Sequence, residues 1–179
     1  DYFHHEVAKK IAKTTFDVGY SNDSGVRELV ENAGAMMGEI ELDAERQVMN
    51  VFLSELVKAS PKAAYGERMI RQALEQGAVG RLLISESLRK NSLTLQCTSC
   101  GHEWQASIGK MEALPNCPSC KAAGDNAKVL KSISLIEELT EMASKSNTEV
   151  VYISVDTEEG GQLLHGFGGL AGICRYPIM

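Results

Sequence analysis

The chain has 179 residues, of which 44% are hydrophobic and 23% are charged, and its formal net charge at pH 7 is −6. This composition is typical of a globular protein and excludes a largely disordered chain. The acidic balance disfavours a nucleic-acid grip spread over the whole surface, because phosphate contacts need clustered lysine and arginine. No apolar run approaches the roughly 18 residues of a membrane-spanning helix, so we expect no membrane association and a cytoplasmic location.

The N-terminal third of the sequence predicts mainly helix. Phe3, Val7 and Ile11 are spaced by four residues, which places them on one face of a first helix. Pro61 disfavours helix in the residue before it and bounds the last helix of this part. The expected elements are a helix over 1–13, a short strand over 14–18, a turn-rich loop over 20–25, and amphipathic helices over 25–37 and 42–58. Because Asp1 is not a methionine, we expect the sequence to be a piece of a longer protein.

From residue 63 onward, short helices alternate with apolar strands. The expected elements are a strand over 63–65, a helix over 66–76, a strand over 78–85, a helix over 133–144, a strand over 149–155, a helix over 159–165 and a strand over 170–176. Gly77 fits a left-handed residue that ends the helix before it. Alternation of helices with apolar strands predicts the α/β class, as an α/β sandwich around a mixed sheet.

Between residues 92 and 130 the composition changes. This stretch holds four of the five cysteines, the single tryptophan and two of the four prolines, but few long aliphatic side chains. It therefore predicts an insert between a strand and the next helix. An insert of this size buries too little apolar surface to fold without further support.

The four cysteines of the insert form two CxxC pairs, Cys97 with Cys100 and Cys117 with Cys120, separated by 16 residues. Two such pairs at this separation are typical of a four-thiolate structural zinc site, which has no open position for catalysis. We expect one Zn²⁺, whose binding energy supplies the missing folding energy. Free thiols or a redox pair are the alternatives, and His102 is the alternative to one thiolate.

Two stretches carry a resemblance to a known family. Residues 65–67 (YGE) leading to 73–79 (ALEQGAV) are similar to the helix–strand signature of the C-terminal domain of the release-factor and Pelota superfamily. Residues 160–176 (GGQLLHGFGGLAGICRY) resemble the end of that domain. The GFGG stretch and the strand after it resemble archaeal peptide chain release factor subunit 1, a class I translation termination factor. An insert with two cysteine pairs resembles the zinc-binding mini-domain of the archaeal form.

The resemblance implies a domain organisation and a fold. The fold of that family is an α/β sandwich related to kink-turn-binding ribosomal proteins, here with a small zinc-ribbon-like mini-domain. The expected division is a helix over 1–14 leading out of a middle domain, a sandwich over 15–91 and 131–179, and the zinc mini-domain over 92–130. Stop-codon reading and peptidyl-tRNA hydrolysis would belong to other domains, so we expect a partner-docking domain that is not an enzyme.

Gly160, Gly161 and Gln162 repeat the GGQ tripeptide with which class I release factors hydrolyse peptidyl-tRNA. The family's catalytic loop belongs to the middle domain and has basic flanks, which suit the phosphates of tRNA. Here acidic residues precede the tripeptide and Leu163 and Leu164 follow it. We therefore interpret the tripeptide as structural, at the start of a helix.

The resemblance also implies partners and a partner face. The partners are a translational GTPase related to elongation factor 1-alpha, an ABC-type ribosome-recycling ATPase and the ribosome. The face that meets the GTPase would include the end of the last strand, with Gly172, Ile173, Arg175 and Tyr176. A Pelota-like ribosome-rescue factor and a kink-turn-type RNA-binding domain are the alternatives, although the expected RNA edge offers little lysine or arginine.

Overall fold

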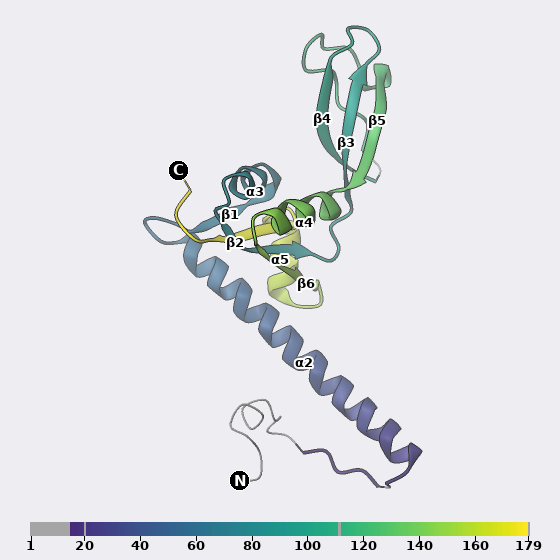
Figure 1. Ribbon diagram of the computed structural model, residues 1–179, viewed down its shortest axis with the longest axis vertical. Helices are drawn as coiled ribbons and strands as arrows, with labels where there is room; N and C mark the ends of the chain where they lie inside the picture. The colour runs from purple at the N-terminus through teal and green to yellow at the C-terminus, as the bar shows by residue number, and fades with distance from the viewer. Residues whose placement is uncertain (1–14, 20, 111, 179) are drawn as a thin grey trace. The chain divides into compact units, whose positions relative to one another are not determined.

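A computed structural model describes residues 15–19, 21–110 and 112–178, and for residues 35–41 it describes the backbone alone. Its core is a four-stranded mixed sheet, the large sheet, in the order β1 (Ala63–Tyr65), β7 (Leu170–Cys174), β2 (Val79–Ser85) and β6 (Glu149–Ile153) (Figure 1). The β2–β6 pair is parallel and the two pairs with β7 are antiparallel. The predicted mixed sheet is confirmed.

Helices cover both faces of the large sheet, and its central strands β2 and β7 carry buried apolar side chains on both faces. Side chains of α3 (Gly66–Glu75) and α4 (Leu135–Lys145), among them Ile70 and Leu139, join Leu82 and Ile84 in one core cluster. The other face packs Leu83 against the C-terminal part of α2 (Asp23–Leu56) and α5 (Glu158–Gly166). The buried α2 and α5 side chains on that face are Met49, Phe52 and Leu163. The result is a helix–sheet–helix sandwich, as predicted.

The structure corrects three expectations about the N-terminal part, two of them through helix α2. Helix α2 is one continuous helix, whereas two helices over 25–37 and 42–58 were expected. The intervening residues contain Gly38 but no proline, and one glycine inside a helix costs only about 1 kcal/mol. The helix begins inside the expected loop over 20–25. The strand expected over 14–18 is absent from residues 15–18, and the helix expected over 1–13 lies outside the described residues.

The N-terminus of α2 is capped by the Asn22 side chain, which accepts hydrogen bonds from the backbone N–H groups of Ser24 (3.1 Å) and Gly25 (3.3 Å). The boundary between two compact units of the chain falls inside this helix, after Ala44. No helix among the described residues combines the length and the apolar character that crossing a bilayer requires.

Between β2 and α4 the chain forms a second sheet of three antiparallel strands, the small sheet. Its order is β4 (Glu103–Gly109), β3 (Lys90–Cys97) and β5 (Ala127–Ser134), and a single 3₁₀ turn, Gly124–Asn126, precedes β5. The insert was expected over 92–130, and the strands of the small sheet extend beyond it at both ends. Helix α4 therefore begins at Leu135, two residues later than expected.

Candidate metal centre and partner face

The four cysteines of the small sheet lie in two similar turns. The backbone N–H of Cys97, the last residue of β3, donates to the His102 carbonyl (2.9 Å), and that of Gly101 donates to the Cys97 carbonyl (2.8 Å). In the second turn the N–H of Cys117 donates to Ala122 (2.9 Å), and that of Lys121 donates to Cys117 (3.0 Å). Both turns therefore direct a pair of sulfurs to one place.

The four sulfur atoms fit a single ion. They lie within 4.8 Å of one another, and the Sγ–Sγ distances are 3.6 Å for Cys97–Cys120 and 3.7 Å for Cys100–Cys117. A Zn²⁺ ion with four sulfurs at about 2.3 Å sets an S–S edge of about 3.8 Å, whereas a disulfide needs about 2.05 Å. The arrangement can hold a metal ion, and His102 is not one of the clustered groups.

The protonation of the sulfurs also favours a bound cation. Burial raises the pKa of Cys97. Hydrogen bonds from the backbone N–H groups of Cys100 and Ser99 and from neighbouring thiols outweigh this effect and lower the pKa to about 6. The backbone N–H of His102 lowers the pKa of Cys100, but hydrogen bonding with Cys120, burial and the other sulfurs raise it to about 12. Four close sulfurs cannot all ionise without a cation among them.

The rest of the small sheet surrounds this centre with few apolar side chains. The imidazole of His102 is exposed and stacks on Trp104, with ring centroids 6.2 Å apart and an interplanar angle of 12°. Lys121 holds the second turn with a positive φ of 63°, at the position that Gly101 occupies in the first turn. A Cβ at Gly124 would meet the Leu114 carbonyl oxygen at 1.9 Å, so the returning chain depends on this glycine.

The GGQ tripeptide lies in the first turn of α5. The Thr157 side chain caps this helix by accepting the backbone N–H of Gly160 (3.0 Å). Gly160 is buried, and a Cβ there would lie 1.8 Å from the Ser154 carbonyl oxygen. Gln162 is exposed on the same helix. A helical first turn packed against backbone differs from an accessible loop, so the helix position agrees with the structural interpretation.

The residues expected at the partner face follow the last strand. Strand β7 ends at Cys174, so the strand expected over 170–176 is two residues too long and Arg175 and Tyr176 follow it. Cys174 is a buried thiol, and burial raises its pKa to about 11. Arg175 donates to the carbonyls of Gly77 (2.9 Å), Asn147 (2.7 Å) and Ser146 (3.2 Å). Tyr176 donates to the Gln76 carbonyl (2.9 Å). Both side chains therefore fasten the C-terminal segment to the ends of α3 and α4.

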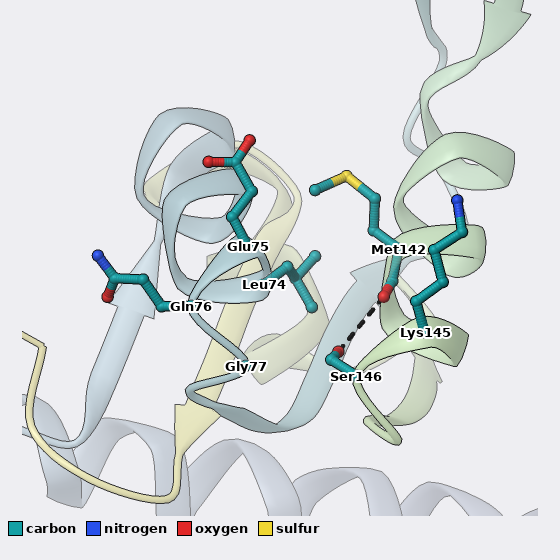
Figure 2. A pocket seen from close by; sticks show the side chains of 7 residues that line it. All are labelled: Leu74, Glu75, Gln76, Gly77, Met142, Lys145 and Ser146. Carbon is teal, nitrogen blue, oxygen red and sulfur yellow. Dashed lines mark hydrogen bonds between the residues drawn. The ribbon is translucent and has the colours of Figure 1, made fainter.

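A groove of about 480 Å³ lies between these two helix ends (Figure 2). Leu74 and Met142 give it an apolar floor, with Glu75 and Lys145 at its rim. Gly172 and Ile173 precede this region inside β7. Gly172 is buried, with Ile70 Cδ1 2.9 Å from the position of a Cβ, and Ile173 is half-buried on the opposite face.

An α/β sandwich that carries a four-cysteine sheet between β2 and α4 defines the class of this molecule. Residues 42–178 match the protein family described as eRF1 domain 3, and the chain belongs to that family. The family recognised from the YGE and GICRY stretches is thereby confirmed.

The relatives include archaeal translation termination factors. The chain is 40% identical over 178 residues to peptide chain release factor subunit 1-1 of Methanosarcina acetivorans, which covers 98% of this chain and 43% of the relative. It is 40% identical over 184 residues to peptide chain release factor subunit 1 of Pyrococcus abyssi, which covers 99% of this chain and 44% of the relative. The chain thus spans less than half the length of the curated relatives that it matches.

Solved structures agree. The C-terminal domain of a peptide chain release factor from Methanosarcina mazei superposes with a TM-score of 0.70 at 38% identity, covering 88% of this chain and 98% of that domain. Pelota from Archaeoglobus fulgidus has a TM-score of 0.56 at 19% identity, with coverage of 91% and 39%. The Pelota likeness shows a shared fold, whereas the release-factor likeness extends to the sequence.

Proposed function

We propose that this chain is the partner-docking C-terminal domain of a class I peptide chain release factor in translation termination. The match of 98% of the Methanosarcina mazei C-terminal domain at 38% identity carries this proposal. The 19% identity to Pelota favours a release factor over the ribosome-rescue alternative. The proposed division is a sandwich over 15–91 and 131–179 with a mini-domain over 92–130, whose strands β3 and β5 cross these bounds to Lys90 and Ser134. The proposed location is the cytoplasm.

The mini-domain binds one structural Zn²⁺ through Cys97, Cys100, Cys117 and Cys120. Sulfur–sulfur distances of 3.6 and 3.7 Å support a closed tetrahedral site, in which no position is open to water or substrate. Elemental analysis of the purified chain tests this. One zinc per chain is expected, and Cys97→Ser is expected to lose it. Any metal content far below one ion per chain, with the small sheet still ordered, would contradict the assignment.

The domain itself is not an enzyme. Gly160 is buried in the first turn of α5, and an acidic segment precedes it, so the tripeptide presents neither a mobile loop nor a basic surface to tRNA. Incubation of this chain with ribosomes that carry peptidyl-tRNA at a stop codon is expected to release no peptide above background. Release by this chain alone would overturn the proposal, and the full-length factor is the positive control.

The partners are a translational GTPase related to elongation factor 1-alpha, an ABC-type recycling ATPase and the ribosome. Proteins of the same fold support this: a ribosome-bound archaeal Pelota is described with ABCE1, and yeast Dom34 is described as interacting with Hbs1. The proposed GTPase face includes Gly172, Ile173, Arg175 and Tyr176, beside the groove between α3 and α4. Since Gly172 is buried, its contribution is to let β7 pack and thereby to place Arg175.

Titration calorimetry with the cognate GTPase tests the proposed face. Tyr176→Phe removes the hydroxyl that binds Gln76 but keeps the exposed ring, whereas Tyr176→Ala removes both. We expect Tyr176→Ala to weaken GTPase binding more than Tyr176→Phe does. Arg89→Ala is the control, because Arg89 also donates to backbone carbonyls, those of Glu86 and Leu88, at another place. Equal weakening by Arg89→Ala and Tyr176→Ala would contradict the proposed face.

A further inference from the structure

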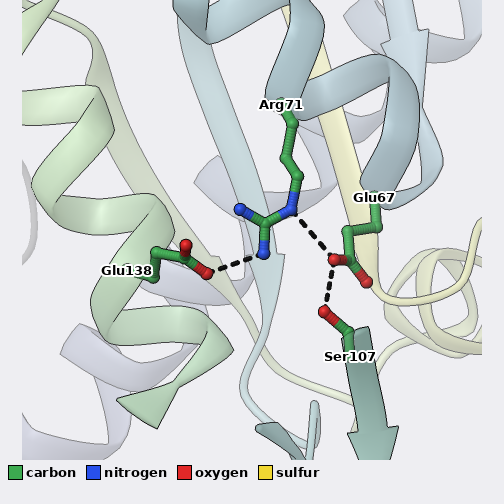
Figure 3. Close-up of polar contacts among 4 residues, drawn as sticks. All are labelled: Glu67, Arg71, Ser107 and Glu138. Carbon is green, nitrogen blue, oxygen red and sulfur yellow. Dashed lines mark hydrogen bonds and ion pairs between the residues drawn. The ribbon is translucent and has the colours of Figure 1, made fainter. Parts of the chain in front are cut away.

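A network of polar side chains joins the small sheet to helices α3 and α4 (Figure 3). At its centre the Arg71 guanidinium holds two carboxylates: Nε bonds Glu67 Oε1 at 2.9 Å, and Nη2 bonds Glu138 Oε2 at 2.6 Å. The three side chains are only 19 to 25% exposed. Partial burial strengthens such pairs relative to surface ion pairs.

Two serines of the small sheet complete the network. The Ser107 hydroxyl of β4 donates to Glu67 Oε1, and Ser92 of β3 lies near enough to Glu138 to lower the pKa of its carboxyl group. Ser92 and Ser107 lie directly opposite each other in the β3–β4 register. We call these five side chains the ring: Arg71 holds both carboxylates, Ser107 binds Glu67, Ser92 lies close to Glu138, and the two serines are cross-strand neighbours.

The ring attaches the small sheet to the sandwich at a place where the polypeptide chain does not connect them. The small sheet has two covalent connections to the sandwich: residues 86–89 lead from β2 to β3, and β5 passes directly into α4 at Leu135. Two connections at one end of a sheet permit rotation about the line that joins them. Strand β4 has no covalent connection to the sandwich, so its bond from Ser107 to Glu67 supplies a third point of attachment.

The charges of the ring favour one orientation of the small sheet relative to the sandwich. Two carboxylates and one guanidinium leave one excess negative charge, which Lys131 of β5 partly offsets at Glu138, and the Ser107 hydroxyl donates to Glu67. If the small sheet rotated away, the half-buried carboxylates would lose these donors, and water would have to replace them. We infer that this ring is a clasp that fixes the angle between the small sheet and the sandwich, and hence the position of the four-cysteine centre.

Residual dipolar couplings of the full, zinc-loaded chain test the clasp. For the wild type, the amide couplings of the large and small sheets are expected to fit one alignment tensor. The double variant Ser92→Ala/Ser107→Ala removes both hydroxyls and keeps the Arg71 pairs. For this variant we expect two separate tensors, with the magnitude of the small-sheet tensor reduced about twofold by added motion.

Control variants separate a clasp from general destabilisation. Ser132→Ala removes an exposed hydroxyl from β5 of the same sheet and is expected to keep the common tensor. Arg71→Lys keeps a charge but loses the planar fork that reaches both carboxylates, so it is expected to separate the tensors as well. Zinc content verifies that each variant keeps its small sheet. A common tensor in the double serine variant, or the same separation in Ser132→Ala, would overturn the inference.

Discussion

The large and small sheets differ in what holds them together. The large sheet is covered on both faces, and its strands bury Leu82, Leu83 and Ile84 completely. Among the described residues between 90 and 134, the buried apolar side chains are Leu93, Leu95 and two of the four cysteines. Six of the eight residues of β5 are exposed. The first sheet is stabilised by burial, and the second needs another source of free energy.

The magnitudes show how large that source must be. Burial of two leucine side chains contributes about 3–6 kcal/mol, whereas structural zinc contributes about 10–16 kcal/mol to small peptides that fold around it. The proposed Zn²⁺ would therefore provide most of the stability of the small sheet, whereas the buried core of the sandwich does not include the cysteine cluster. The two sheets should respond differently to metal removal and to core substitutions.

The largest expected effect is the loss of the small sheet when metal is removed. Cys97→Ser, or a chelator, is expected to abolish hydrogen-exchange protection of the amides in β3, β4 and β5, while β2 and β7 stay protected. Cys174→Ala is the control, because Cys174 is buried in the sandwich and takes no part in the cysteine cluster. If hydrogen exchange in the small sheet did not change on metal removal, the two sheets would not differ in their dependence on metal.

The second prediction concerns the sandwich and uses the two glycines of the GGQ tripeptide. Gly160→Ala places a methyl group 1.8 Å from the Ser154 carbonyl oxygen, so the free energy of unfolding of the sandwich should fall by at least about 3 kcal/mol. Gly161→Ala meets no atom within 4 Å and should raise it by about 0.5–1 kcal/mol, through helix propensity. Neither change should alter the zinc content.

Urea unfolding followed by far-UV circular dichroism measures both glycine variants. The matched pair separates packing from chemistry, because both substitutions destroy the tripeptide but only one creates a clash. If Gly160→Ala and Gly161→Ala changed the free energy of unfolding equally, the close packing of Gly160 against Ser154 would not determine its contribution to stability.

Much of the sandwich and the cysteine site could be predicted from sequence because their signals are local. Residues 78–85 are mostly apolar and include the run Leu82, Leu83 and Ile84, and two CxxC pairs imply their geometry by spacing alone. The continuity of α2 could not be predicted, since Gly38 and the residues near it offered a plausible break that tertiary structure does not use.

The clasp could not be predicted because it depends on the strand register. Glu67 and Arg71, at i and i+4, are readable as a helix pair. Glu138 lies 67 residues beyond Arg71, and Ser107 lies 40 residues beyond Glu67, so only the fold brings them together. The positive φ of Lys121 could not be predicted either, because lysine rarely adopts this left-handed backbone conformation.

A third, smaller effect is expected at the start of α5. The Thr157 hydroxyl accepts the Gly160 N–H, and removing such a cap costs about 1 kcal/mol. Thr157→Ala should lower the free energy of unfolding of the sandwich by that amount. Thr157→Ser retains the hydroxyl and should restore most of it. Thermal unfolding monitors both variants, and a serine variant as unstable as the alanine variant would exclude the cap as the cause.

The smallest effect is a pH dependence at the clasp, where the small sheet meets helices α3 and α4. The hydrogen bond from Arg71 lowers the pKa of Glu138 below its ordinary value of 4.5, against the effect of burial, and Ser92 and Lys131 lower it further. A lowered folded-state pKa means that this stabilisation is complete above pH 4.5 and is lost as the pH falls through the folded value. The facing charged groups are Arg71, Lys131 and Glu141, and only protonation of a carboxylate removes charge in this range.

Dipolar couplings measured on zinc-loaded protein above pH 4.5 and at a pH well below it, where Glu138 takes up a proton in the folded state, check this dependence. Metal loss at low pH is a separate event, because thiolates also take up protons there. The measurement therefore includes the zinc content, and only samples that retain one ion per chain are compared. Glu138→Gln removes the titrating group and should give the same tensors at both pH values. If the tensors of Glu138→Gln changed with pH as those of the wild type do, another carboxylate would be the titrating group. Glu138 would then have no part in the pH dependence of the clasp.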